Sequence, residues 1–248
     1  MPRVLRTVIP RIRKSLRERG VVTSVRRSFL LPVHLFQEYR RGRTMVPSPE
    51  RSEFDRKFSV DTDGDFDDWT YLSDLEISSP NWIDGTDYTP IHPQRLVGIL
   101  ASLSLKYEDF VFVDFGSGKG RALLIASQFP FRRIIGVEFS PVLHATAERN
   151  IARYKSLAQR CRNIQSLCMD FTRFPLPLEP AVFYFFDPCH QAVLAQVLSN
   201  MENSLRAHPR KMLVIYVAPR LQHLMDSAGF LKKIATNEEL QFSLYEEI

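Results

Sequence analysis

The sequence predicts an α/β domain whose sheet is mostly parallel and carries helices on both faces, preceded by a basic helical extension. Strand-like apolar runs alternate with helix-period segments from residue 91 onward, and such alternation requires crossover connections between parallel strands. A glycine cluster directly follows the first of these runs. The last two runs are separated only by the short sequence NEE, which is too short for a crossover, so these two strands must pair antiparallel.

The individual elements follow from the hydrophobic pattern. The strand-like runs are rich in Val, Ile, Phe and Tyr, as is typical of strands buried on both faces. The intervening segments place apolar residues three and four positions apart, which predicts helices. The predicted strands are 110–115, 133–139, 164–170, 181–188, 211–219, 230–236 and 240–248. The predicted helices are 92–103, one beginning near 120, 141–159, 190–205 and 220–228.

Most of the excess positive charge lies in residues 1–44. This segment holds twelve Arg and Lys residues against two Glu, a net charge of +10, whereas the remainder of the chain has a net charge of −5. Apolar residues at helical spacing predict two or three short basic amphipathic helices. Three interpretations stay open: a solvated extension packed on the domain, a surface for anionic membranes or nucleic acid, and a cleaved transit peptide.

Residues 45–90 are rich in Pro, Ser, Asp and Gly and show no hydrophobic period, which predicts an irregular connector or wrapping arm. Within it, DTDGDFDDW, residues 61–69, has alternating carboxylates like those of a calcium loop. The glycine stands at loop position 4 instead of 6, and Leu72 replaces the Glu of position 12. We therefore interpret this stretch as an acidic surface loop.

Composition favours a cytoplasmic protein without a metal site. No apolar run reaches the roughly 18 residues that a membrane-spanning helix requires. Cys161, Cys168 and Cys189 lack metal-type spacing and leave one thiol over if paired, which favours a reducing compartment. The six histidines form no pair at helical spacing. If the protein contacts a membrane surface, we expect residues 1–44 to make that contact.

The most informative segment is VDFGSGKGR, residues 113–121, in which a predicted strand turns into a predicted helix. Glycines at such a turn allow unusual φ angles and let a ligand approach the backbone closely. Gly116, Gly118 and Gly120 have the spacing G-x-G-x-G. A dinucleotide fingerprint would need a third glycine at Arg121, and the segment does not fit a P-loop either.

This segment resembles motif I of the class I S-adenosylmethionine (SAM)-dependent methyltransferases, in which an acidic residue ends strand 1 just before G-x-G-x-G. Asp114 matches that acid. Glu138, at the end of the second predicted strand, matches the acid that binds the ribose hydroxyls; a carboxylate accepts hydrogen bonds from a diol and would repel a 2′-phosphate. Asp170, in CMDF, matches the adenine-contacting acid, and Phe171 would form a wall for the ring.

The resemblance covers about residues 91–248. It implies a Rossmann-like seven-stranded sheet with one reversed strand near the edge, and SAM as the cofactor. The implied cofactor-binding residues are Asp114, Gly116, Ser117, Gly118, Gly120, Glu138, Phe139, Asp170 and Phe171.

The methyl acceptor is expected next to FYFFDPCH, residues 183–190, where the fourth predicted strand ends. In amine-modifying members of the family this position reads Asn/Asp-Pro-Pro-aromatic, and its side-chain oxygen accepts a hydrogen bond from the target nitrogen. Asp187-Pro188 matches the first half, whereas Cys189 and His190 replace the second proline and the aromatic residue. We therefore expect Asp187 to be a catalytic residue facing a protein lysine or another amine; capping of the next helix is its alternative role.

Two further resemblances concern neighbouring residues. Pro188-Cys189 resembles the Pro-Cys element of cytosine-C5 methyltransferases, in which a thiolate attacks the pyrimidine ring. Tyr88-Thr89-Pro90 resembles the Y-x-P segment that lies over the cofactor in DOT1-like protein lysine methyltransferases and related bacterial proteins, so Tyr88 is a candidate lid residue of the catalytic site; an ordinary tyrosine of the connector is its alternative role. A cytosine-C5 enzyme, a small-molecule methyltransferase and a non-catalytic SAM-binding adaptor acting through residues 1–44 are the alternative functions.

Overall fold

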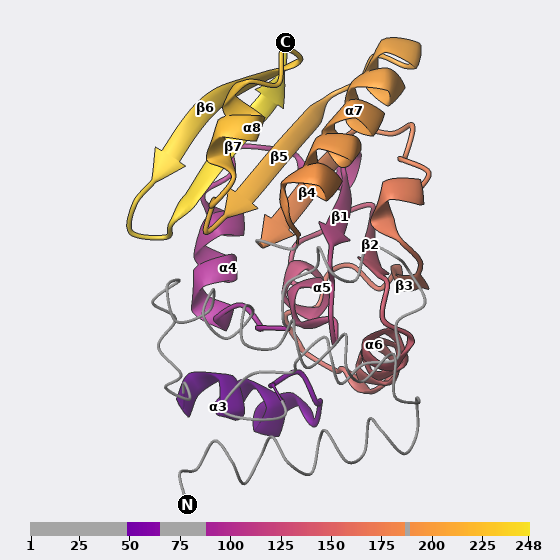
Figure 1. Ribbon diagram of the computed structural model, residues 1–248. Helices are drawn as coiled ribbons and strands as arrows, with labels where there is room; N and C mark the ends of the chain where they lie inside the picture. Colours follow the sequence, from indigo (N-terminus) through magenta and orange to yellow (C-terminus); the bar gives the residue numbers. More distant parts are fainter. Residues whose placement is uncertain (1–48, 65–87, 187–188) are drawn as a thin grey trace, which may run out of the picture. The chain divides into compact units, whose positions relative to one another are not determined.

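Seven strands form one sheet in the computed structural model, which describes residues 49–64, 88–186 and 189–248 (Figure 1). The strands are β1 (Val111–Phe115), β2 (Arg133–Glu138), β3 (Ile164–Cys168), β4 (Ala181–Phe186), β5 (Met212–Val217), β6 (Leu231–Asn237) and β7 (Phe242–Glu247). Their order is β3-β2-β1-β4-β5-β7-β6, with β1 to β5 parallel and β7 antiparallel to both of its neighbours. The predicted parallel sheet with a terminal antiparallel hairpin is confirmed.

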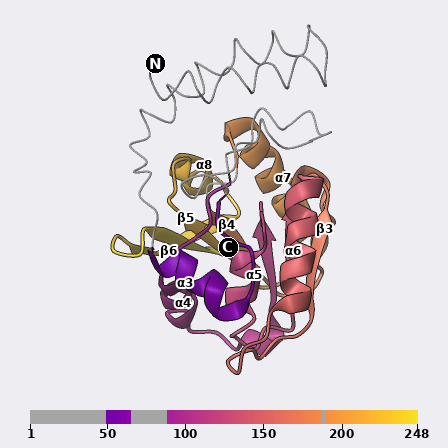
Figure 2. The same cartoon turned by 90° about the horizontal axis from the view of Figure 1, so that it is seen from below.

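Helices cover both faces of this sheet, as Figures 1 and 2 show. They are α4 (Pro93–Ala101), α5 (Arg121–Ala126), α6 (Pro141–Arg153), α7 (Gln191–Ala207) and α8 (Gln222–Asp226), with 3-10 turns η3 (Tyr107–Asp109) and η4 (Phe171–Arg173). Apolar residues of α7 and α8 pack on one face, and those of α4 and α5 pack on the other. The helices predicted for residues 1–44, and Asp187, lie outside the described residues.

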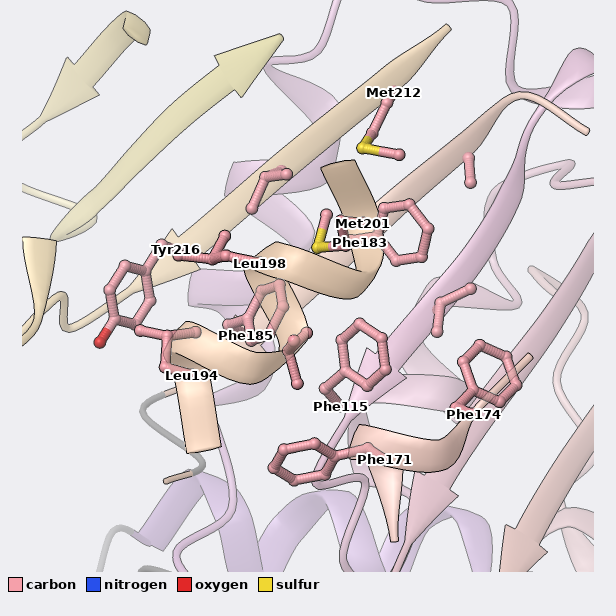
Figure 3. Close-up of a cluster of buried hydrophobic side chains, with 14 of the residues drawn as sticks. Phe115, Phe171, Phe174, Phe183, Phe185, Leu194, Leu198, Met201, Met212 and Tyr216 are labelled. Carbon is pink, nitrogen blue, oxygen red and sulfur yellow. The ribbon is translucent and has the colours of Figure 1, made fainter. Parts of the chain in front are cut away.

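Each face of the sheet has its own hydrophobic core, because successive strand residues point to opposite sides. In β1, Val113 and Phe115 belong to the α7 side, whereas Phe112 belongs to the α4 side. Figure 3 shows the first of these cores, in which the Phe115 ring lies 4.9 Å from that of Phe185 and 5.7 Å from that of Phe171, centroid to centroid. Close aromatic packing of this kind holds the end of β1, and with it the start of the glycine loop, in place.

Residues 49–58 form a helix, α3 (Pro49–Phe58), inside the segment that we expected to be irregular. Its sequence PERSEFDRKF contains two apolar residues, Phe54 and Phe58, which is too few to produce a detectable hydrophobic period. Both rings pack against Tyr154, at 6.4 and 4.9 Å between centroids. The helix therefore depends on this tertiary contact, and composition alone could not predict it.

Candidate cofactor site

A pocket lies at the carboxyl ends of β1, β2 and β4, beside the glycine loop. Because β2 and β4 pair with opposite edges of β1, this is the point where the strand order reverses, and open parallel sheets bind ligands at such points. The predicted site residues that line the pocket are Tyr88, Asp114, Gly116, Ser117, Glu138 and Phe139. Residues from three strands and from the segment before α4 are thus brought together.

The loop between β1 and α5 has a backbone that favours glycine. Gly116, Gly118 and Gly120 have φ angles of 83°, 54° and 86°, which lie in the left-handed region that side chains with a Cβ rarely adopt. A Cβ at Gly118 would lie 2.1 Å from Cε2 of Tyr88. Gly118 therefore also gives the Tyr88 ring room to lie directly against the loop.

Glu138 connects the end of β2 to this loop. Its side chain is buried; one carboxylate oxygen accepts a hydrogen bond from the backbone N–H of Gly118, and the other from that of Ser140, each at 2.8 Å. Burial raises the pKa of Glu138 to about 7, although these N–H groups lower it. Each oxygen retains a second acceptor position. The carboxylate can therefore accept hydrogen bonds from two ligand hydroxyls while it holds the loop.

Protonation of Glu138 is expected to weaken the binding of a ligand diol. Because its pKa is about 7, the carboxylate is ionised above pH 7 and protonated below it, and a protonated oxygen donates where the ligand needs an acceptor. Calorimetric titration should therefore show that the affinity for SAM does not change between about pH 8 and 9. Below pH 7 the affinity should fall by up to about tenfold per pH unit.

The same group makes the ligand-free protein less stable as pH rises. The folded-state pKa of about 7 exceeds the ordinary 4.5, so between these values the folded state binds more protons than the unfolded state, and stability falls with rising pH by about 3 kcal/mol in total. Urea unfolding at pH 5 and pH 8 should show most of this difference, about 2.5 kcal/mol, in the wild type and a smaller one in Glu138→Gln. Equal differences in both proteins would contradict the assignment to Glu138.

Asp114 and Tyr184 form the floor of the pocket on β1 and β4, directly opposite each other in register. Burial and the nearby Glu138 carboxylate raise the pKa of Asp114 well above its usual value. Burial, together with the Asp114 charge, raises the pKa of the Tyr184 hydroxyl. The carboxyl group of Asp114 and the hydroxyl group of Tyr184 thus lie on neighbouring strands in a desolvated environment, which favours a ligand that carries positive charge or hydroxyl donors.

Unpaired polar atoms concentrate at this pocket. Within the described ranges, six buried side-chain nitrogen or oxygen atoms have no hydrogen-bond partner. Four of the six belong to residues that line the pocket, namely Thr89 Oγ1, Ser117 Oγ, Arg121 Nη1 and Tyr184 OH. Buried polar groups in folded proteins are normally paired. Their accumulation here fits a pocket built for a ligand with many polar groups, as SAM is.

Segment 55–63 packs onto the glycine loop through charged groups that sequence reasoning missed. Arg121 is buried and donates from Nη2 to Asp55 Oδ1 at 3.3 Å and to Asp63 Oδ1 at 2.5 Å. Lys119 Nζ pairs with Asp61 Oδ1 at 3.1 Å. Asn150 of α6 donates to the backbone oxygens of both Asp61 and Lys119, at 2.6 and 2.9 Å. The cofactor loop is therefore held from outside by residues that precede the sheet.

This contact corrects the interpretation of residues 61–69 as an acidic surface loop, as far as the described residues 61–64 extend. Thr62 is fully buried, and the carboxylate of Asp63 contacts the buried guanidinium of Arg121. The carboxylates of Asp61 and Asp63 pair with Lys119 and Arg121 of the glycine segment. The matching signal in the sequence is the pair of basic residues in GKGR, whose charges complement DTD.

Tyr88 forms a wall of the pocket. Its ring lies against Gly118, and its hydroxyl donates to the backbone oxygen of Thr62 at 2.7 Å. Burial raises the pKa of this hydroxyl, so it remains protonated at neutral pH. Tyr88 therefore lines the pocket, and its hydroxyl holds segment 55–63; a role in covering the cofactor stays a prediction.

Of the described residues, the candidates that follow β3 and β4 are not among those that line the pocket. Asp170 Oδ1 accepts hydrogen bonds from the backbone N–H and the hydroxyl of Thr172, at 2.9 and 2.7 Å, and so caps η4. Phe171 is buried in the core beside Phe115 (Figure 3), and neither Asp170 nor Phe171 lines the pocket. Cys189 is buried in the same core. Asp187 and Pro188 lie outside the described residues.

The topology identifies the fold. A reversed β7 stands between β5 and β6 at one side of an otherwise parallel sheet, which is the arrangement that the resemblance implies, and the G-x-G-x-G loop lies at its ligand-binding edge. The chain has the class I methyltransferase fold. Among its described residues, no helix is long and apolar enough to cross a membrane, and no group of three or more His, Cys, Asp or Glu side chains could hold a metal ion.

Several solved structures are similar to this chain at low sequence identity and low TM-score. No protein-family model and no curated protein matches the chain, but many solved structures do. A predicted N6-adenine-specific DNA methylase from Listeria monocytogenes has 15% identity and a TM-score of 0.47, covering 64% of this chain and 51% of that one. This chain thus spans about half the length of that protein.

Two other solved structures have different substrates in their names. A ribosomal protein L11 methylase from Lactobacillus delbrueckii subsp. bulgaricus has 11% identity and a TM-score of 0.42, covering 64% of this chain and 79% of its own. A precorrin-6y C5,15-methyltransferase from Geobacter metallireducens has 14% identity and a TM-score of 0.42, covering 71% and 94%. These proteins have different acceptors in their names, and none of those acceptors is carried over to this chain.

Proposed function

We propose that this protein is a SAM-dependent methyltransferase. The observation that supports this most strongly is Glu138, a buried carboxylate that ends β2, lines the pocket and bonds to the backbone of Gly118. A carboxylate in this place can accept hydrogen bonds from both hydroxyls of a ribose. Bound SAM supplies an electrophilic methyl group on a positively charged sulfonium.

The residues of the pocket suit a cationic nucleoside. Asp114 and Glu138 place carboxyl groups in a region of low dielectric, where their attraction for a cation is stronger than in water. Tyr88 and Phe139 add aromatic side chains to the lining. Gly116 lets the ligand approach the backbone at the end of β1. The chain thereby positions a donor, and positioning supplies much of the rate in an in-line displacement.

For the acceptor, we propose an amine, with a protein lysine as the leading substrate class. Tyr184 and Phe186 of β4 line the pocket, and Asp187 directly follows Phe186 in the sequence. Asp187 would accept a hydrogen bond from the acceptor N–H, orient the nitrogen lone pair toward the methyl group and take up the proton. Cys189 is buried in the α7-side core and is not among the residues that line the pocket, which argues against cytosine-C5 chemistry.

Binding of radiolabelled SAM tests the cofactor assignment. Glu138→Ala should weaken binding by about tenfold to a hundredfold, because it removes a charged acceptor from two hydrogen bonds. Glu108→Ala is the matched control, since Glu108 is exposed and precedes β1 at the other end of the strand. Unchanged tight binding by Glu138→Ala would refute the ribose assignment.

The same labelled SAM, incubated with host lysate that is then separated into protein, RNA, DNA and small molecules, tests the acceptor. We expect label in protein or another amine, and we expect Asp187→Ala to lose transfer while SAM binding stays at the wild-type level. Label confined to nucleic acid would refute the lysine proposal. Binding without any transfer would favour a non-catalytic adaptor.

A further inference from the structure

Arg121 lines the pocket, and one nitrogen of its buried guanidinium has no hydrogen-bond partner among the described residues. Its Nε donates to Thr62 Oγ1 at 2.6 Å, and its Nη2 donates to Asp55 and Asp63. Its Nη1 has no partner anywhere in the described part of the chain, although the residue is only 1% exposed and lines the pocket. A guanidinium carries five N–H donors, so the donors on Nη1 are desolvated without compensation in the ligand-free protein.

Thr89 adds a second unpaired group. It lines the same pocket, and its Oγ1 is buried without a hydrogen-bond partner among the described residues. A hydroxyl and a guanidinium N–H are both donors, and buried donors that remain unpaired cost free energy unless a ligand accepts from them. The complementary ligand group is an acceptor with several lone pairs and a negative charge, and a carboxylate meets this description.

The positive and negative groups of the pocket act on different neighbours. The charge of Arg121 acts on the Tyr88 hydroxyl, whereas the charge of Glu138 acts on the carboxyl group of Asp114. A purely cationic ligand would leave Arg121 unsatisfied, and a purely anionic one would be repelled by the two acids. A ligand with a cationic part and a separate carboxylate would satisfy both the guanidinium of Arg121 and the carboxyl groups of Asp114 and Glu138.

We infer that Arg121 and Thr89 bind the amino-acid carboxylate of SAM and make the pocket select for it. This inference rests on the proposed function. Arg121 is the first residue of α5, follows Gly120 directly and lines the pocket, so a ligand held at the cofactor loop would lie next to it. Because Thr62, Asp55 and Asp63 hold the other side of the guanidinium, carboxylate recognition also depends on segment 55–63, which lies before the sheet.

The test compares SAM with decarboxylated SAM, which lacks only the carboxylate, by calorimetric titration. The quantity of interest is the ratio of the two dissociation constants. Arg121→Lys keeps the positive charge beside the aspartates but loses the planar fork, and Thr89→Val removes an unpaired hydroxyl at little cost to folding. We expect each variant to reduce the preference for SAM by about tenfold, mainly through weaker SAM binding.

Arg133→Lys is the matched control, because Arg133 also pairs with a carboxylate, Glu179, but stands at the opposite end of β2. Its ratio should equal that of the wild type. An unchanged ratio in both Arg121→Lys and Thr89→Val would overturn the inference, as would equal losses for both ligands, which would assign the two residues to the fold alone. Failure of the wild type to bind either ligand would instead refute the proposed function.

Discussion

Gly118→Ala is expected to lower the free energy of unfolding by about 3 kcal/mol and to prevent measurable SAM binding. At φ 54°, an alanine costs about 1 to 2 kcal/mol in the left-handed region. Its Cβ would also lie 2.1 Å from the Tyr88 ring, and relieving such an overlap costs a further 1 to 3 kcal/mol, roughly. The ring cannot move freely, because its hydroxyl is bonded to Thr62.

Urea unfolding measures the loss of stability in Gly118→Ala, and calorimetry measures the loss of SAM binding. Gly229→Ala is the control, because a Cβ there meets nothing within 4 Å, and it should change stability by less than about 0.5 kcal/mol. In a Tyr88→Ala background, the cost of Gly118→Ala should fall to the backbone contribution of about 1 to 2 kcal/mol. An equal cost in both backgrounds would show that the ring contact is not the cause.

The sheet could be predicted from the sequence because its signals are local. Each strand is a short apolar run, and the alternation with helices decides the parallel pairing without knowledge of distant contacts. The NEE connection predicted the final antiparallel hairpin, because it is too short for a crossover between parallel strands. Glu138 was predictable for a related reason, since the carboxyl ends of parallel strands meet at one edge and the residue type at each end can be read directly.

Long-range contacts without a sequence pattern were not predictable. Asp55 and Asp63 contact Arg121 across 66 and 58 residues of sequence, and any basic residue would have been an equally good partner on charge alone. Phe171 follows β3 as expected, but chain position does not decide which way a ring points, and the aromatic core around Phe115 accommodates it (Figure 3). Helix α3 was missed because its stability comes from contacts made elsewhere in the chain.

Asp55→Ala is expected to destabilise the folded protein by about 4 kcal/mol, because removing one partner of a buried ion pair leaves an incompletely compensated charge. The carboxylate of Asp55 accepts four hydrogen bonds, from the N–H groups of Thr62 and Asp63, from the Thr62 hydroxyl and from Arg121. Its side chain is 13% exposed and that of Arg121 only 1%, so water can replace little of what is lost.

Asp61→Ala provides the contrast within the same segment. Asp61 also pairs with a basic residue of the glycine loop, Lys119, but its side chain is 62% exposed, and such a pair contributes about 0 to 1 kcal/mol. Urea unfolding at 0.05 and 0.5 M salt should show the Asp55 effect unchanged and the Asp61 effect reduced by screening. If both variants lost the same stability, the segment would be held by its backbone contacts with Asn150, and the buried Arg121 network would not be what fastens it to the cofactor loop.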